Sequence, residues 1–305
     1  MTADNTGAQV SVVIPTRGGP LLQRAVDSAL NQDGVSVEVI VALNGSTTSP
    51  SFSDRRVIVI ETPSSEGANG ARSRGIARAR SPYTALLDDD DWWHPEKLKL
   101  QLSAMATLTA ETDAPWIIGC RVNEIHPGGK EKVTPRRFWG KTGPIPAYLF
   151  RRTSIISDRP QLQTSTLLFE TDLGKQVLFN PGRKFHQDWT WLVEADEIGA
   201  RAFILDEVLG SREIGTRGSI SGGITWRQSL DWANELLVDR RTRGDFSLVF
   251  VAAKAARAGS IGGVIRSFSW ALRHGEPSAF AMIFGLRMLL AATLAQLRTK
   301  IRRLR

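Results

Sequence analysis

Four consecutive aspartates, Asp88–Asp91, are the residues of this chain whose type and spacing are best suited to chemistry. Adjacent carboxylates repel one another and raise each other's pKa unless a cation or hydrogen-bond donors compensate the charge. Hard divalent cations such as Mg²⁺ and Mn²⁺ prefer oxygen ligands, and often take one or two protein carboxylates together with substrate phosphates. The run therefore predicts a divalent-cation site. The alternative is an acidic helix N-terminus, which Asp91 would cap ahead of Pro95.

The aspartates follow one of several predicted strands. Short apolar runs rich in β-branched residues alternate with segments that have helical spacing. The predicted strands are Val10–Ile14, Val35–Leu43, Val57–Glu61 and Tyr83–Leu87, and the predicted helices are Pro20–Gln32, Asn69–Arg80 and Pro95–Thr109. Such alternation is typical of βαβ units. We therefore predict an α/β fold, a Rossmann-like and mostly parallel sheet flanked by helices.

Three polar segments come directly after predicted strands: Pro15-Thr16-Arg17, Asn44-Gly45-Ser46 and the aspartate run. In an open parallel sheet, ligands bind beyond the carboxyl ends of the strands. The fold therefore predicts that these segments, which are distant in sequence, meet at one edge of the sheet and form one site.

The C-terminal part of the chain differs in pattern and in charge. Residues 225–305 read as successive helices, so we divide the chain into a first domain, residues 1–224, which carries the polar segments at the strand ends, and a helical region, residues 225–305. The net charge of the chain is +8, and residues 240–305 hold 13 basic and two acidic residues. A charge asymmetry of this kind indicates that the tail meets an anionic surface.

Residues 280–305 form a basic amphipathic helix on a helical wheel. One side carries Ile283, Leu286, Leu289, Leu290, Leu297, Ile301 and Leu304, and another carries Arg287, Arg298, Arg302 and Arg305. This pattern favours a helix that lies at an anionic membrane surface. Arg287 would make it a poor spanning helix. The alternative is that the leucine side packs on the protein.

Composition and cysteine content exclude several classes of protein. The hydrophobic and charged fractions, 42% and 23%, are those of an ordinary globular protein rather than of a disordered or multi-span membrane chain. The single cysteine, Cys120, excludes a disulfide framework and any two-cysteine redox centre. The N-terminus has no basic start followed by an apolar run, so we expect a cytoplasmic protein, peripheral at the inner face of the plasma membrane. We expect no nucleic-acid partner, because no aromatic residues are interleaved with the charges of the tail.

Four runs of the sequence together resemble one known family. VSVVIPT, EVIVALNGS, GANGARSRGIARA and YTALLDDDDWWHPEKL match, in order and spacing, the family 2 inverting glycosyltransferases of GT-A fold. The resemblance covers about residues 10–102 and continues more weakly to Phe185–Trp189. It implies transfer of a sugar from a nucleotide-diphosphate donor to a hydroxyl of a glycan or lipid-linked acceptor, in the synthesis of cell-surface polysaccharide or glycolipid.

The resemblance also implies residues that bind the donor nucleotide. Pro15 and Thr16 would line the nucleotide pocket. The family usually carries acidic residues after the second strand, where this chain has Leu43 and Asn44. The Asn44 amide can still bond the edge of a base. Arg72 would face the diphosphate, a role that suits a guanidinium fork.

The family's D-x-D signature falls on Asp88-Asp89-Asp90. By this resemblance Asp88 lies near the ribose, with Asp89 beside it on the donor side, and Asp90 binds a Mn²⁺ or Mg²⁺ ion that bridges the diphosphate and stabilises the leaving group. Inversion by direct displacement also needs a carboxylate that deprotonates the acceptor hydroxyl. Asp188, in Gln187-Asp188-Trp189, matches the family's base; the alternative is that it only caps a helix.

Two other functions fit parts of the sequence. A sugar nucleotidyltransferase would carry a Gly-rich basic loop after the first strand, which Thr16-Arg17-Gly18-Gly19 resembles faintly. A non-catalytic sugar-nucleotide-binding protein would be consistent with the replacement of the family's acidic residues by Leu43 and Asn44.

Overall fold

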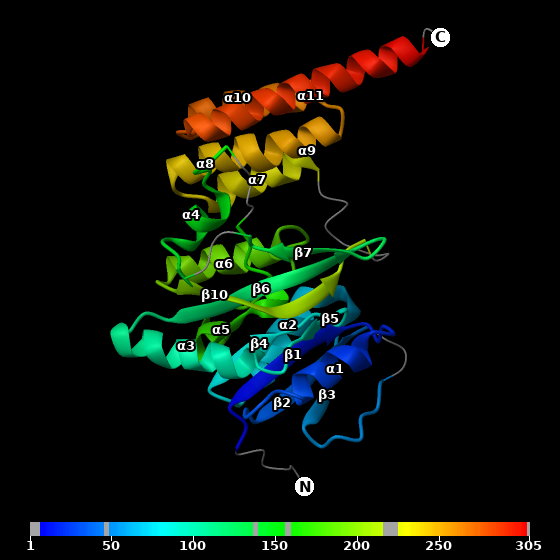
Figure 1. Cartoon of the computed structure of the whole chain (residues 1–305), viewed down its shortest axis with the longest axis vertical. Helices are drawn as coiled ribbons and strands as arrows, with labels where there is room; N and C mark the ends of the chain where they lie inside the picture. The colour runs from blue at the N-terminus through cyan, green and yellow to red at the C-terminus, as the bar shows by residue number, and fades with distance from the viewer. Residues whose placement is uncertain (1–6, 46–48, 137–139, 156–159, 216–224, 304–305) are drawn as a thin grey trace. The chain divides into compact units, whose positions relative to one another are not determined.

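The structure is a computed structural model that describes residues 7–45, 49–136, 140–155, 160–215 and 225–303 (Figure 1). Contacts between residues divide the chain into two compact units. The first comprises residues 1–145 and 159–217, and the second comprises residues 146–158 and 218–305. The second unit is therefore built from two stretches of sequence, of which the sequence analysis anticipated only the C-terminal one.

The first unit is organised around a single ten-stranded sheet. Eight strands follow one another across it in the order β3 (Val57–Thr62), β2 (Val37–Asn44), β1 (Val10–Thr16), β4 (Tyr83–Leu86), β9 (Leu168–Glu170), β6 (Trp116–His126), β10 (Arg201–Glu213) and β5 (Asp91–Trp93). Two further strands, β7 (Lys130–Thr134) and β8 (Gly140–Lys141), pair with β6 and β10.

The sheet is parallel in one half and mixed in the other. Strands β3, β2, β1 and β4 are parallel, as βαβ units require. Beyond β4 the strand β9 is antiparallel to both its neighbours, and β5 is antiparallel to β10. The α/β class is as predicted. The antiparallel strands of the mixed half were not predicted, because β5 and β9 have three residues each and leave no periodic signal in the sequence.

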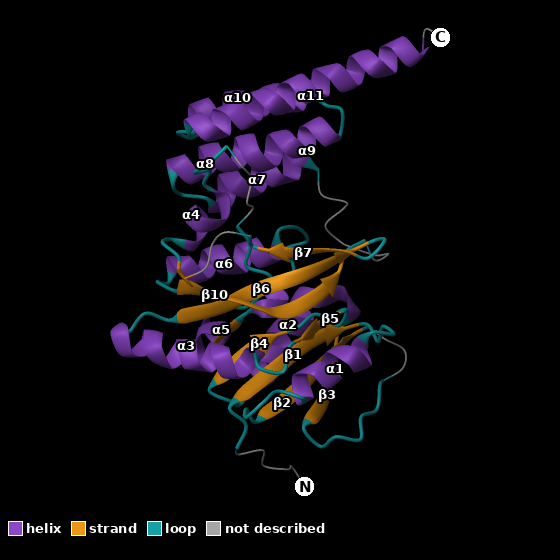
Figure 2. Ribbon diagram, viewed as in Figure 1, coloured by secondary structure: helices purple, strands orange, loops and turns teal. Residues whose placement is uncertain are grey.

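Helices cover both faces of this sheet, as Figure 2 shows. They are α1 (Leu22–Leu30), α2 (Gly67–Arg78), α3 (Lys97–Glu111), α5 (Thr171–Gln176) and α6 (Gln187–Glu197), with short 3₁₀ turns at Ser64–Glu66 (η1) and Thr164–Thr166 (η2). Helix α1 buries residues at spacings of three and four, so one stripe faces the sheet. Helix α2 approaches β1 closely at Gly75, where an added Cβ would come within 2.3 Å of Val13 Cγ1.

The second unit is helical. It contains α4 (Ile145–Phe150, of which Ile145 belongs to the first unit), α7 (Trp226–Leu236), α8 (Arg240–Phe246), a π-helical turn (Ser247–Val251), α9 (Ala252–Arg257), α10 (Ile261–His274) and α11 (Ala279–Arg303). An aromatic cluster joins its two stretches of chain. The Phe150 ring contacts the rings of Trp232, Phe246 and Phe250 at centroid distances of 5.1–5.8 Å. These edge-on contacts explain why α4 belongs to the helical unit.

Candidate functional site

The acidic run lies at the carboxyl end of β4, next to the end of β1. The Thr16 hydroxyl, at the last position of β1, donates to Asp89 Oδ2 at 2.5 Å and accepts from the backbone N–H of Gly18 at 2.9 Å. Pro15 is buried within β1, and Asn44 is buried at the end of β2, beside Leu43, which pairs with Thr16. The described parts of the three predicted segments therefore lie at one edge of the sheet; Ser46 lies outside the described residues.

Arg72 brings helix α2 into this site. Of the arginines in or just after α2, Arg72 alone is buried, with 8% of its side chain exposed, and its Nη2 donates to Asp88 Oδ1 at 2.6 Å. Arg74 instead pairs with Glu66 at the surface. The Arg72 Nε atom is buried and has no hydrogen-bond partner among the described residues. A buried donor without a partner costs stability unless a ligand uses it. The Arg72 guanidinium can therefore donate to a further anionic group.

Helix α2 also fixes the segment that leads to α6. The Asn69 side chain donates to the carbonyl oxygens of Asn180 and Arg183 at 2.8 and 3.0 Å, and the Ser73 hydroxyl donates to the Phe179 carbonyl oxygen at 2.8 Å. These bonds hold the chain just before α6 against α2. They explain how Asp188, a hundred residues away from the acidic run in sequence, is brought to the same site.

Asp188 lies in the first turn of α6, and the N-cap of that helix is His186, which adopts the left-handed conformation with φ 54°. Asp188 is therefore not the helix cap. The ring of Trp191 anchors the helix, because it stacks on Phe179 at 5.3 Å and donates its indole N–H to the Val177 carbonyl oxygen at 2.6 Å. Trp191 is thus a core residue rather than a sugar-stacking one.

Protein surrounds Asp188 on most sides, although part of its side chain remains accessible. Burial raises the pKa of Asp188 and the charge of Asp88 adds to that effect, whereas Arg72 and Arg212 lower it. The Thr164 hydroxyl also lowers it, although no hydrogen bond of standard geometry joins the two side chains. The acidic run and Asp188 therefore interact electrostatically through one guanidinium.

Burial and neighbouring negative charge raise the pKa values of three carboxylates of the acidic run, Asp89, Asp90 and Asp91. Burial is the main cause for Asp89 and Asp90, whose pKa values are raised further by neighbouring aspartate charges. Burial and the charge of Asp88 raise the pKa of Asp91 to about 8. The helix that follows has Glu96 at its N-cap, so Asp91 does not cap it. A set of under-neutralised carboxylates of this kind favours a cation.

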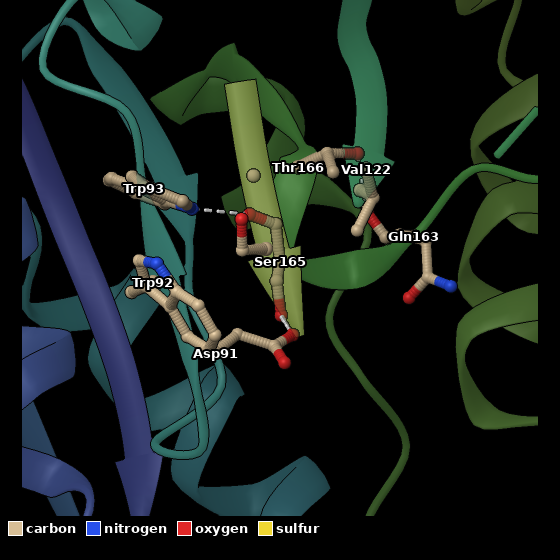
Figure 3. A pocket seen from close by; sticks show the side chains of 9 residues that line it. Asp91, Trp92, Trp93, Val122, Gln163, Ser165 and Thr166 are labelled. Atoms are coloured by element: carbon tan, nitrogen blue, oxygen red, sulfur yellow. Dashed lines mark hydrogen bonds between the residues drawn. The ribbon is translucent and has the colours of Figure 1, made fainter. Parts of the chain in front are cut away.

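Asp91 and Trp93 are both held by Ser165, as Figure 3 shows. The Ser165 hydroxyl donates to Asp91 Oδ2 at 2.5 Å and accepts from the Asp88 backbone N–H at 3.2 Å. The Trp93 indole N–H donates to the Ser165 carbonyl oxygen at 2.6 Å. Ser165 therefore holds the backbone and the side chains of the segment from Asp88 to Trp93 in place. Sequence analysis missed this residue, because it belongs to a short 3₁₀ turn in a segment without periodicity.

Two further arginines were also missed. The Arg24 guanidinium lies 3.8 Å from the centre of the Trp92 ring and donates to the Asp90 carbonyl oxygen at 3.0 Å. Arg212, on β10, pairs with Glu124 at 2.5 Å and donates to Gln163 Oε1 at 2.8 Å. The Arg212 charge lowers the pKa of Asp90, Asp91 and Asp188. No local pattern marks either arginine, since both reach the site from other elements.

The carboxylates fit a cation that is shared with a substrate. Among the described residues, no group of three or more His, Cys, Asp or Glu side chains is arranged to hold a metal ion by itself. Mg²⁺ is commonly held by one or two carboxylates and substrate phosphates rather than by a complete protein cage. The raised pKa values of Asp89, Asp90 and Asp91 and the unpaired Arg72 donor are what such an arrangement needs.

Comparison with known proteins now adds a family. Residues 11–160 match the model of the family described as glycosyl transferase family 2. Residues 11–160 therefore belong to glycosyltransferase family 2. The family match runs from β1 through the acidic run.

Curated relatives of this family 2 chain are named as glycosyltransferases. The chain is 30% identical to the amylovoran biosynthesis glycosyltransferase AmsB of Erwinia amylovora over 190 residues. These residues are 62% of this chain and 61% of that protein. The chain is 34% identical over 87 residues to the UDP-Glc:alpha-D-GlcNAc-diphosphoundecaprenol beta-1,3-glucosyltransferase WfaP of Escherichia coli, 27% of this chain and 35% of that one. The chain thus matches less than two thirds of the length of each of these two relatives.

A solved structure confirms the fold of this family 2 chain. Residues 1–349 of TarS from S. aureus, in complex with UDP-GlcNAc, superpose with a TM-score of 0.60 and 14% sequence identity, covering 94% of this chain and 92% of that one. At this identity the likeness concerns the fold alone. The predicted α/β GT-A architecture is therefore confirmed.

Proposed function

We propose that this family 2 chain transfers a sugar, with inversion, from a nucleotide-diphosphate donor to a hydroxyl of a glycan or lipid-linked acceptor. The observation that carries the proposal is the position of Arg72. Its guanidinium pairs with Asp88 and also interacts with Asp188, so the donor-side carboxylates and the candidate base belong to one site. A displacement with inversion needs a base on the face of the sugar opposite the departing diphosphate, which is the role that we give to Asp188.

On the donor side, each residue has a chemical task. Thr16 and Asn44 border the position of the nucleoside, Asp88 accepts from the ribose, and Arg72 offers its free Nε donor to the diphosphate. Asp90, with Asp89 nearby, would hold Mn²⁺ or Mg²⁺. That ion, when bound, neutralises charge that develops on the departing diphosphate.

On the acceptor side, Asp188 acts as the general base. The acceptor O–H proton passes to the Asp188 carboxylate while the acceptor oxygen forms its bond to the anomeric carbon. The bond between that carbon and the diphosphate oxygen breaks, and the diphosphate leaves with the electron pair. Because burial raises the pKa of Asp188, the ionised carboxylate is a stronger base than an exposed aspartate.

The relatives support the choice of substrates. WfaP is named for a UDP-glucose donor and a diphosphoundecaprenol-linked acceptor, and AmsB for the biosynthesis of a polysaccharide. The TarS complex holds UDP-GlcNAc. A nucleoside-diphosphate sugar and a lipid-linked or polysaccharide acceptor are therefore the substrate classes that we propose for this chain.

Ligand-induced thermal stabilisation tests the donor and the cation together. Nucleoside diphosphates of the different bases are added with and without Mn²⁺, and binding raises the melting temperature through linkage. We expect one base to stabilise the chain, more strongly with Mn²⁺, and Asp90→Asn to remove the Mn²⁺ contribution while the protein stays folded. If Mn²⁺ and donor stabilise the Asp90→Asn variant as much as they stabilise the parent chain, Asp90 does not hold the cation. Release of pyrophosphate from a nucleoside triphosphate and a sugar phosphate would overturn the proposal in favour of a nucleotidyltransferase.

A further inference from the structure

Helix α11 exposes a continuous row of large aliphatic side chains. The row consists of Ile283, Leu286, Leu290, Leu294 and Leu297, which are between 42% and 61% exposed. Their separations of three, four, four and three residues place them on one side of an α-helix. We call this row the aliphatic stripe. The alternative that the leucine side of the tail packs on the protein is therefore wrong for these described residues.

The opposite side of α11 is the one that packs on the second unit. Ala281, Gly285 and Ala292 are buried there, and an added Cβ at Gly285 would come within 2.7 Å of the Phe268 ring. Farther along the helix, Gln296 donates to the Gly259 carbonyl oxygen at 2.9 Å. Small residues thus dock α11 along most of its length, and they turn the stripe away from the helices beneath.

The charged residues of α10 and α11 are all of one sign. Neither α10 nor α11 contains an acidic residue. Arg266 and Arg273 are exposed on α10, and Arg287 is exposed one position beyond Leu286 on α11. The sequence of α11 adds Arg298, Lys300, Arg302 and Arg303 toward its end. A surface that combines large aliphatic side chains with uncompensated positive charge is complementary to an anionic lipid surface.

We propose that the aliphatic stripe of α11 lies in the interface of an anionic membrane, with the helix parallel to the membrane plane. This goes beyond the proposed transfer reaction, and it does not depend on it. In this orientation the leucines enter the boundary between headgroups and acyl chains, and the arginines meet lipid phosphates.

Two other occupants of the stripe are less compatible with the contacts of α11. The stretch Ala279–Leu297 is long and apolar enough to cross a membrane by length and composition, and 17% of it is buried. A crossing helix would have to give up the contacts of Ala281, Gly285 and Gln296, and it would carry Arg287 into the hydrocarbon. A second copy of the chain would bring two uncompensated sets of arginines together, which like-charge repulsion opposes.

Vesicle co-sedimentation of the full chain tests the proposal. The vesicles are neutral phosphatidylcholine or phosphatidylcholine with one quarter phosphatidylglycerol. We expect binding to the anionic vesicles at least tenfold tighter than to the neutral ones, weakened by high salt. The variant Leu286→Gln/Leu290→Gln/Leu294→Gln should lose at least tenfold in affinity for anionic vesicles. Its matched control is Val238→Gln, since Val238 is a 77% exposed aliphatic residue outside the stripe.

Several outcomes would overturn the proposal. They are equal binding of both vesicle types, unchanged binding of the triple variant, and membrane attachment that resists both high salt and alkaline carbonate, which indicates a crossing helix. A dimer of the parent chain in light scattering that the triple variant converts to monomer would assign the stripe to a second copy. Circular dichroism and donor-induced thermal stabilisation of the triple variant show that it is folded, and they separate this result from that of the transferase proposal.

Discussion

A buried carboxylate in the second unit, Asp245, and two in the acidic site of the first unit, Asp91 and Asp188, differ in how far hydrogen bonds compensate their charge. In the second unit, Asp245 is completely buried and accepts four hydrogen bonds, from the Arg152 and Ser278 backbone N–H groups at 2.7 and 2.6 Å, the Ser278 hydroxyl at 3.1 Å and Arg241 Nε at 3.2 Å. These partners come from three separate segments, so the carboxylate ties the unit together. A buried charge that is satisfied in this way serves the fold.

At the acidic site of the first unit, Asp91 and Asp188 lack such compensation. Burial raises the pKa of both Asp91 and Asp188, and the charge of Asp88 raises both further. Folding leaves negative charge crowded at this edge of the sheet, at a cost in stability. The difference teaches that a satisfied buried carboxylate identifies a structural joint, whereas unsatisfied ones identify the place where a cation or a proton is to arrive.

The largest expected effect is on activity, and it distinguishes the carboxylates of the acidic site from the structural ones. Asp188→Asn should lower kcat by about 10²–10⁴-fold, because the acceptor hydroxyl loses its general base. Its melting temperature should not fall, because the amide removes a buried charge. Initial rates of sugar transfer and thermal unfolding measure the two quantities. A fully active variant, or one that unfolds at lower temperature and has lost donor binding, would place Asp188 with the structural carboxylates.

The next effect concerns stability. Asp245→Asn should lower the free energy of unfolding by about 2–4 kcal/mol, because the amide nitrogen cannot accept from the donors that surround the carboxylate. Denaturant unfolding followed by fluorescence measures this change. A nucleoside diphosphate should still stabilise the folded variant, because the proposed donor-binding residues lie in the first unit. Unchanged stability would show that four hydrogen bonds do not make this carboxylate structural.

The smallest effect is a shift in pH dependence. The base must be ionised, so the rate falls as the pH falls through the pKa of Asp188. Arg72→Met removes the charge that lowers this pKa, and the acid limb of the kcat profile should move to higher pH. Arg74→Met is the control, because Arg74 pairs with Glu66 at the surface. Identical shifts in both variants, or none in Arg72→Met, would mean that Arg72 does not tune the base.

Sequence patterns were sufficient for the parallel half of the sheet and for the acidic run. The strands β1, β2 and β4 are mainly apolar, and the run of aspartates after β4 is conspicuous on its own. The supporting residues could not be found in this way. Ser165 meets Asp91 across 74 positions of sequence, and Arg212 reaches the site from β10, so only long-range pairing of strands determines their places. The pairing of Arg72 with Asp88 likewise depends on the tertiary structure and could not be read from the sequence.

The splicing of residues 146–158 into the helical unit has a consequence for biosynthesis and for engineering. As the chain leaves the ribosome, Phe150 is made long before Trp232, Phe246 and Phe250, so α4 gains these ring contacts only after α7, α8 and the π-helical turn have emerged. No single cut in the chain frees either unit intact. Chimaeras between this chain and a relative must therefore exchange two pieces at once, the short inner stretch together with the C-terminal helices.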